Sequence, residues 1–267
     1  MASPEHDLDP VLDKDGVRLT VDDAIATVTL TNPAKRNAQS PALWRALAEA
    51  GRLLPGSVRV VLLRAEGKSF SAGLDRQAFT PEGFDGEPSF IDLARGSDAE
   101  LDATIAEYQE AFTWWRRSDI VSVAAVQGHA IGAGFQLALA CDLRVVADDV
   151  QFAMRETSLG LVPDLTGTHP LVGLVGYARA LEICVTGRFV TAEEAVSTGL
   201  ANLAVPLDQL DGAVRDLTSA ILAAPRNAVI ETKALLRGVQ GRSYEEQRAA
   251  ERQAQARRLR DLAGVGE

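Results

Sequence analysis

The sequence predicts an α/β core followed by a helical C-terminal extension. Two mainly apolar runs, Val58–Leu63 with Arg59 inside it and Val121–Val126 with Ser122 inside it, are typical of buried parallel strands, and each is followed by a glycine-bearing turn and a helical pattern. From Gly176 onward the apolar residues recur mostly at helical spacing. Two strand–helix units followed by helices indicate an α/β fold. The chain of 267 residues is long enough to form one large domain or a domain with an appendage.

The N-terminal part predicts two strands and a helix. Val17–Val21 and Ile25–Leu30 alternate as strands do and are separated by an Asp-Asp turn. An Asn-Pro pair then interrupts the chain. Ser40 and Pro41 offer an N-cap and a first-turn proline, so we expect a helix that ends near Leu54.

The middle of the chain predicts a long helix and two short strands. The segment Thr80–Ser89 is rich in Pro, Gly and acids, so we expect a mobile surface segment there. Apolar residues recur at helical spacing from Leu101 to Trp115, which predicts an amphipathic helix. A helix ending near Cys141 precedes expected strands at Leu143–Val146 and Val150–Phe152.

The last part of the chain predicts helices. Leu210 to Ile221 carries one helical apolar pattern, and Asn227 to Gly238 is expected to form a second helix. A basic run between Arg252 and Arg260 is interleaved with Glu and Gln, which is typical of a solvated helix face.

Composition and charge exclude several functional classes. The net charge is −10 and no basic stripe precedes the C-terminal helix, so we expect no nucleic-acid partner. The start of the chain has no apolar signal-peptide core and no apolar run is long enough to span a membrane, so we expect no membrane association. Cys141 and Cys184 form no disulfide framework, and the three histidines are dispersed. We therefore predict a cytoplasmic protein without a metal site.

A glycine-bearing segment, Phe70–Asp75, follows the first buried strand. Gly73 permits a backbone conformation that other residues resist, and Asp75 is suited to cap a helix that starts there. Such a junction exposes backbone N–H groups that have no intrahelical partner. On this feature alone, a tight structural turn remains the favoured interpretation.

A second glycine-bearing segment, Gly128–Gln136, also lies between a strand and a helix. Gly132 and Gly134 let a ligand approach the backbone, and the N–H groups at the helix start face outward. The dinucleotide fingerprint fails because Leu137 stands where its third glycine belongs, and no Gly-Lys-Ser/Thr phosphate loop follows. Both kinds of nucleotide site are therefore excluded.

Two carboxylates, Glu156 and Asp164, are eight residues apart with Gly160 and Pro163 between them, so a turn can bring them together. Paired carboxylates in a pocket can act as acid and base when burial separates their pKa values. The spacing alone favours structural roles, with Glu156 in a first helical turn and Asp164 in a Pro-Asp turn.

Taken together and in order, these segments resemble the crotonase superfamily, the enoyl-CoA hydratase/isomerase family. The resemblance runs from about Val17 to Arg237. Each motif is moderately specific, whereas the ordered set is strong. The motifs are Asn32–Ala38, Phe70–Asp75, Gly128–Asp142, Gln151–Gly167, Thr186–Arg188 and Ala195–Asn202.

The resemblance implies a fold and an assembly. Members of this family fold as a crotonase-like spiral of ββα units with a C-terminal helical region. We therefore expect a spiral core over residues 1–200 and a helical trimerisation region over residues 201–267. The resemblance also implies a homotrimer or a hexamer built from two trimers.

The resemblance further implies an acyl-CoA substrate and a backbone oxyanion hole. The two oxyanion-hole donors map to the N–H groups of Leu74 and Ala133, which would stabilise the enolate oxygen of a thioester. Ala133 replaces a residue that is usually glycine, but only the N–H is needed. No cofactor is implied, because coenzyme A enters as part of the substrate. The adenine and phosphates of CoA are expected near Lys35, Arg36, Ala72 and Asp75.

The implied catalytic residues depart from the hydratase pattern. Family hydratases use two glutamates; Glu156 matches the second, whereas Gln136 stands where the first belongs. Gln136 cannot exchange a proton at neutral pH. We therefore expect Glu156 as the principal acid/base, Asp164 as a second carboxylate and Gln136 as a polar positioner. A single base can move a proton between two carbons, so we favour double-bond isomerisation of an enoyl-CoA over hydration.

Two alternatives remain open from the sequence. Gln136 is also compatible with a non-catalytic acyl-CoA-binding protein, although such a protein needs neither Glu156 nor Asp164. A third hypothesis is another reaction through the same enolate, such as thioester hydrolysis or C–C cleavage.

Overall fold

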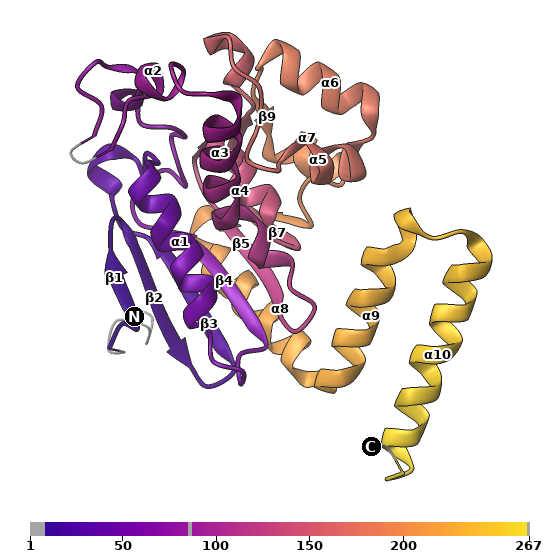
Figure 1. The fold of residues 1–267 in the computed structure, drawn as a ribbon. Coiled ribbons are helices and arrows are strands. Elements are labelled where there is room, and N and C mark those ends of the chain that lie inside the picture. The colour runs from indigo at the N-terminus through magenta and orange to yellow at the C-terminus, as the bar shows by residue number, and fades with distance from the viewer. Residues whose placement is uncertain (1–8, 85–86, 266–267) are drawn as a thin grey trace.

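The computed structural model describes residues 9–84 and 87–265, and a seven-stranded sheet runs through it (Figure 1). In sheet order its strands are β1 (Leu12–Lys14), β2 (Val17–Asp22), β3 (Ile25–Leu30), β4 (Val60–Ala65), β5 (Val121–Val126), β7 (Leu143–Ala147) and β10 (Leu203–Val205). The pairs β1–β2 and β2–β3 are antiparallel, and the remaining pairs are parallel. A smaller sheet contains β6 (His129–Ile131), β8 (Gln151–Ala153) and β9 (Val190–Thr191).

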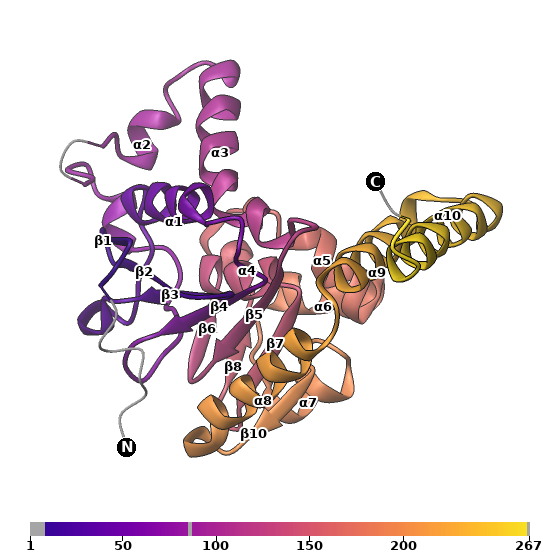
Figure 2. The ribbon, with the colours of Figure 1, turned by 90° about the horizontal axis from the view of Figure 1, so that it is seen from below.

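Helices cover both faces of the large sheet (Figure 2). One face is covered by α1 (Pro41–Leu53), α3 (Asp98–Thr113) and α4 (Ala133–Ala140), and the other by α8 (Leu210–Ala223). The other helices are α2 (Phe90–Leu93), α5 (Thr168–Val175), α6 (Tyr177–Thr186), α7 (Ala192–Ser197), α9 (Arg226–Gly238) and α10 (Tyr244–Leu262). This arrangement confirms the predicted mixed α/β fold with C-terminal helices.

The central strands are buried on both faces, as their mainly apolar sequences predict. In β4, Val61 and Leu63 belong to the core beneath α1 and α4, whereas Val60 and Leu62 belong to a second core beneath α8. Successive side chains of a strand point to opposite faces, so only an unbroken apolar run can satisfy both cores. These strands therefore form a rigid base for the loops at their ends.

Several predicted boundaries are confirmed and two need correction. Ser40 caps α1, because its side chain accepts a hydrogen bond from the N–H of Leu43. The strand expected from Val58 begins only at Val60, since the N–H of Val58 donates to the carbonyl of Pro55 in a turn. The helix expected to reach Trp115 ends two residues earlier and continues as a 3-10 turn.

The described residues of the segment from Thr80 to Ser89 are partly buried, although the composition of the segment predicts a surface position. Gly83 and Ser89 are buried, and Glu87 forms an ion pair with Arg45 of α1. The composition of this segment indicates exposure to solvent. Its contact with α1, a helix distant in the sequence, holds it against the protein instead. The segment ends at α2, which lies against the site described below.

The last two helices project from the rest of the chain (Figure 1). Within the region predicted for residues 201–267, β10 and α8 complete the large sheet and its second face, whereas α9 has no buried residue. Lys233 of α9 donates hydrogen bonds of 2.6 Å to the carboxylate of Asp142 and to the carbonyl of Ile120. Large apolar side chains remain exposed on this pair of helices: Leu236, Tyr244, Leu259 and Leu262.

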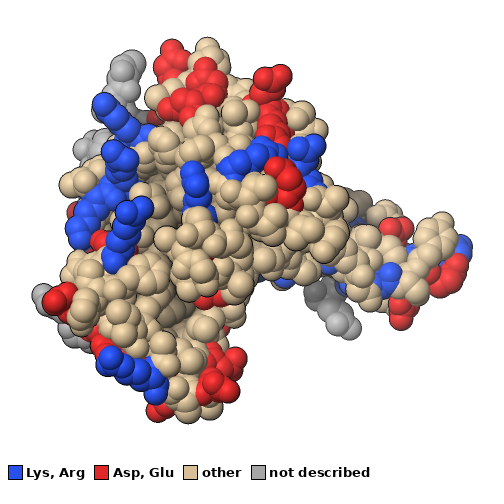
Figure 3. All heavy atoms as spheres, turned by 90° about the horizontal axis from the view of Figure 1, so that it is seen from above, with Lys and Arg blue, Asp and Glu red and all other residues tan. Residues whose placement is uncertain are grey.

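Charge on the surface is mixed. Figure 3 shows Lys and Arg side chains dispersed among acidic and uncharged residues on the face that is uppermost in Figure 1. Among the helices of the described residues, none is both long and apolar enough to cross a membrane.

Candidate active site

The first predicted N–H donor lies in a segment that pairs with Gln39. The N–H of Gln39 donates to the carbonyl of Gly73 at 2.7 Å, and the N–H of Asp75 donates to the carbonyl of Gln39 at 2.8 Å. In such a parallel bridge, the carbonyl of Gly73 and the N–H of Asp75 both point toward Gln39. The N–H of Leu74, which lies between them, therefore points away from Gln39. It has no acceptor among the described residues, and Leu74 lines a cavity of about 940 Å³.

The second predicted donor lies at the start of a helix. Ala133 is the first residue of α4, so its N–H has no intrahelical acceptor. Gly132 before it has φ of +51°, and its carbonyl accepts the N–H of Gln136 at 2.9 Å. A Cβ atom at Gly73 would lie 2.4 Å from the carbonyl oxygen of Ile131 and 3.6 Å from the nitrogen of Ala133. Only glycine therefore lets the two segments approach so closely, and both Leu74 and Ala133 line one cavity.

A buried carboxylate stands beside these N–H groups. Glu156 begins the 3-10 helix η5 (Glu156–Leu159) directly after β8, and 9% of its surface is exposed. Its Oε1 accepts a hydrogen bond of 2.7 Å from Nε2 of Gln136, and its Oε2 has no hydrogen-bond partner within the described residues. A Cβ atom at Gly132 would lie 3.3 Å from Oε1, so the carboxylate sits directly against the start of α4. One carboxylate oxygen is thus held, and the other is free to act.

Gln136 links the carboxylate to the following loop. It is 1% exposed, and its Oε1 accepts the N–H groups of Leu165 at 2.9 Å and Gly167 at 3.2 Å. An amide oxygen has two lone pairs, so its acceptor capacity is used up. Gln136 therefore orients Glu156 and the loop, as expected of a positioner, and has no acceptor left for a catalytic water.

Asp164, the second predicted carboxylate, lines the same cavity. Its carbonyl accepts a hydrogen bond of 2.6 Å from Nε2 of Gln109 on α3. Part of its surface is open to solvent, yet the protein atoms crowded around the carboxyl exclude enough water to raise its pKa. Burial also raises the pKa of Glu156, and the charge of Asp164 raises it further. The turn does bring the two carboxylates together, as their spacing allows.

The four residues predicted to contact CoA are joined by two contacts, and one of them lines the cavity. Ala72 lines it, and the N–H of Ala72 donates to the carbonyl of Arg36 at 2.9 Å. Nζ of Lys35 lies 3.1 Å from a carboxylate oxygen of Asp75. The side chain of Asp75 also caps the 3-10 helix η3 (Arg76–Phe79) by accepting the N–H of Gln77. The capping role predicted for Asp75 is confirmed, whereas CoA contact remains a prediction for all four residues.

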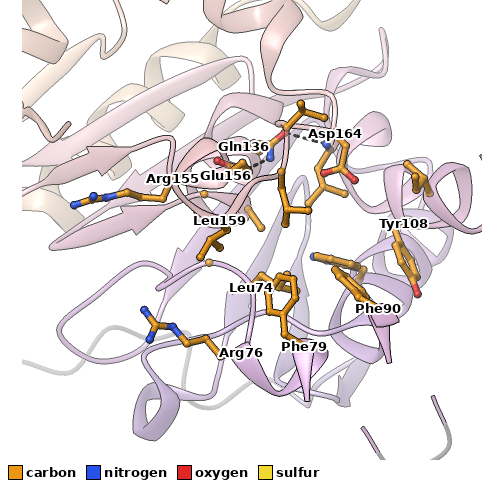
Figure 4. A pocket seen from close by; sticks show the side chains of 18 of the residues that line it. Leu74, Arg76, Phe79, Phe90, Tyr108, Gln136, Arg155, Glu156, Leu159 and Asp164 are labelled. Atoms are coloured by element: carbon orange, nitrogen blue, oxygen red, sulfur yellow. Dashed lines mark hydrogen bonds between the residues drawn. The ribbon is translucent and has the colours of Figure 1, made fainter. Parts of the chain in front are cut away.

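The sequence reasoning missed two groups of residues that line the cavity. Figure 4 shows Arg76 and Arg155 on one side of the carboxylates, and aromatic rings on the other side. We call the two arginines the charged end. Each directly adjoins a residue that the motifs did identify, Asp75 or Glu156. The aromatic end consists of Trp44, Phe79, Phe90 and Tyr108.

No metal-binding cluster of three or more His, Cys, Asp or Glu residues occurs in the described ranges 9–84 and 87–265. The cavity is lined by Leu74 and Ala133 and by two carboxylates with raised pKa values, those of Glu156 and Asp164.

Known proteins share both sequence and fold with this chain. Residues 20–261 match the family model described as enoyl-CoA hydratase/isomerase. A Bacillus subtilis protein named as an enoyl-CoA hydratase/isomerase is 31% identical over 91% of this chain and 91% of its own length. The human mitochondrial Δ(3,5)-Δ(2,4)-dienoyl-CoA isomerase is 33% identical over 67% of this chain and 55% of its own.

Solved structures extend the comparison. A Thermobifida fusca protein named as an enoyl-CoA hydratase, in complex with CoA, is 48% identical with a TM-score of 0.88, covering 93% of this chain and 95% of that one. Its complex with acetoacetyl-CoA gives 48% identity and a TM-score of 0.89 over 92% and 95%. The mixed sheet, the helices that follow it and these matches confirm the predicted crotonase fold. This chain belongs to the enoyl-CoA hydratase/isomerase family.

Proposed function

We propose that this protein isomerises the double bond of an enoyl-CoA thioester. The N–H groups of Leu74 and Ala133 form the oxyanion hole and bind the thioester oxygen. Glu156 carries the proton through its free Oε2. The single observation that carries the choice of reaction is that the side-chain oxygen of Gln136 already accepts two N–H groups. Gln136 therefore offers no acceptor to a water, whereas Oε2 of Glu156 has no hydrogen-bond partner among the described residues.

The proposed reaction balances without a water molecule. Glu156 Oε2 removes a proton from C2 of a 3-enoyl-CoA, and the electron pair moves onto the thioester oxygen, where two N–H groups stabilise it. The protonated Glu156 then returns the proton to C4, the electrons flow back from the oxygen, and the double bond lies between C2 and C3. Asp164 serves as a second carboxylate, whose charge favours proton uptake by Glu156.

The proposed substrate orientation follows from the two ends of the cavity. The phosphates of CoA lie toward the charged end, where Arg76 and Arg155 add to the predicted contacts from Lys35, Arg36, Ala72 and Asp75. The CoA complex of the 48% identical Thermobifida fusca protein supports a CoA thioester as the ligand. Coenzyme A enters here as part of the substrate, not as a resident cofactor.

Substitution of Glu156 tests the proposed reaction. Glu156→Gln should lower turnover of a 3-enoyl-CoA by roughly 10²- to 10⁴-fold, because a positioned acid/base supplies about that factor. The appearance of 2-enoyl-CoA is followed by absorbance, with crotonyl-CoA hydration assayed in parallel. Glu110→Gln, on the exposed side of α3, is the matched control and should leave the rate unchanged.

Three outcomes of this assay would sink the isomerase assignment. Hydration of crotonyl-CoA at a high rate that Glu156→Gln does not change would contradict the proton-transfer role. Tight acyl-CoA binding without turnover of any enoyl-CoA would favour a non-catalytic binding protein. Free CoA or a shortened acyl-CoA among the products would favour thioester hydrolysis or C–C cleavage.

The pH dependence of the reaction should depend on Asp164. Glu156 must be deprotonated to act as a base, so kcat/KM falls as pH drops through its raised pKa, above the ordinary value of about 4.3. Asp164→Asn removes one cause of that raised pKa, so the acidic limb of the profile should move to lower pH. An acidic limb that stays in place, or moves to higher pH, would contradict the coupling of the two carboxylates.

The proposed assembly is a homotrimer or a hexamer of two trimers, with the projecting helices α9 and α10 as its contact region. The support is the apolar surface on these helices, where Leu236 is 69% exposed and Leu262 is 84% exposed. Contact with another copy would remove these exposed apolar side chains from water, which is favourable.

Light scattering tests this assembly. The native protein should have three or six times the chain mass of 28.5 kDa, and the double variant Leu236→Glu/Leu262→Glu should be smaller. Val11→Glu, at an exposed apolar residue far from α9 and α10 in the sequence, is the control and should keep the native mass. A native mass of a single chain would refute the proposal.

A further inference from the structure

The cavity changes character along its length. Figure 4 shows Arg155 and Arg76 toward one side, the carboxylates of Glu156 and Asp164 in the middle, and Phe90 with its aromatic neighbours toward the other side. A thioester whose carbonyl lies at the N–H groups in the middle has its CoA moiety toward the charged end. Its acyl group then extends toward the aromatic end.

The aromatic end is a built apolar surface. The rings of Trp44 and Tyr108 lie 4.8 Å apart, and those of Phe79 and Phe90 lie 5.6 Å apart in an edge-to-face arrangement. Nε1 of Trp44 donates to the side-chain oxygen of Gln39 at 2.8 Å, so the polar atom of this ring is satisfied within the protein. What these rings offer to the cavity is therefore largely hydrocarbon surface.

The helices that carry Phe90 and Tyr108 add further apolar lining. Ile105 and Leu101 of α3 and Leu93 of α2 also line the cavity. The whole cavity, with its charged end included, has a volume of about 940 Å³, which lies near the upper limit of roughly 1,000 Å³ that is usual for small-molecule sites. An acyl group of four carbons leaves the aromatic end without contacts, and atoms that line an unfilled apolar space lose dispersion attraction there.

We propose that the acyl group bound by this protein is an apolar chain longer than four carbons, whose far end packs against the aromatic end. This inference rests on the proposed function only in placing the thioester carbonyl at Leu74 and Ala133. It does not depend on which reaction follows.

Affinity for saturated acyl-CoA thioesters tests the inference separately from catalysis, because these ligands cannot be isomerised. Calorimetry on the full chain compares butyryl-CoA with octanoyl-CoA. Each buried methylene strengthens binding by roughly three- to fourfold. Octanoyl-CoA should therefore bind at least about tenfold more tightly, even if part of the longer chain stays in contact with water.

Variants of α3 show whether the aromatic end causes this preference. Ile105→Trp places a bulky ring across the cavity and should reduce the preference to about threefold or less. Leu101→Trp, one turn earlier, gives a second obstruction should the first variant not fold. Ala106→Trp is the matched control, since Ala106 is exposed, adjoins Ile105 and does not line the cavity.

The outcomes separate this inference from the isomerase proposal. A tenfold preference that Ile105→Trp and Leu101→Trp abolish, and that Ala106→Trp keeps, supports the chain-length inference even when no isomerisation occurs. Equal affinity for butyryl-CoA and octanoyl-CoA would overturn it, as would a preference that both obstructing variants retain or the absence of binding by either thioester.

Discussion

The geometry of the site depends on the side chain of Gln136. Its amide nitrogen holds one oxygen of Glu156, and its amide oxygen holds the N–H groups of Leu165 and Gly167. A buried carboxylate is costly unless it is hydrogen-bonded, and the amide of Gln136 supplies such a bond to Oε1 of Glu156, while Oε2 has no side-chain partner among the described residues. The same side chain anchors the loop that carries Asp164. A carboxylate at position 136 would serve these partners differently, because an ionised one cannot donate to Glu156.

Helix α4 brings the donor and the positioner together on one rigid element. Its first residue, Ala133, presents a free N–H, and Gln136 lies three residues later on the same helix. The far end of the helix is held by two arginines: Arg116 donates to the carbonyls of Leu139 and Ala140, and Arg144 donates to those of Ala138 and Cys141. Cations suit the carbonyl-bearing end of a helix, so α4 is stabilised at the end opposite to the cavity. The proposed oxyanion hole thus relies on a short helix that is held by hydrogen bonds at Gln136 and at its C-terminal end.

Much of the fold follows from the sequence, whereas the shape of the site follows only in part. The mainly apolar sequences of β4 and β5 predict strands buried on both faces, because each strand contributes side chains to a core on either side of the sheet. Sequence resemblance identifies Glu156 and Gln136 but not the hydrogen bond between them, which requires β8 to return beside α4. The aromatic end is invisible to pattern analysis because its rings come from α1, η3, α2 and α3. The composition of residues 80–89 indicates a mobile surface segment, because composition does not register the contact of Glu87 with Arg45. No sequence pattern identified Arg76 and Arg155 as cavity residues, although they are the neighbours in sequence of Asp75 and Glu156.

The central claim is that one carboxylate oxygen carries a proton between two carbons of the substrate. Isomerisation of a 3-enoyl-CoA that bears deuterium at C2, followed by mass spectrometry and NMR of the product, tests this claim most directly. The account predicts that part of the product carries the deuterium at C4 when the native protein acts, and that Glu156→Gln abolishes this transfer. A product with only solvent hydrogen at C4, formed equally fast by the native protein and by Glu156→Gln, would contradict it.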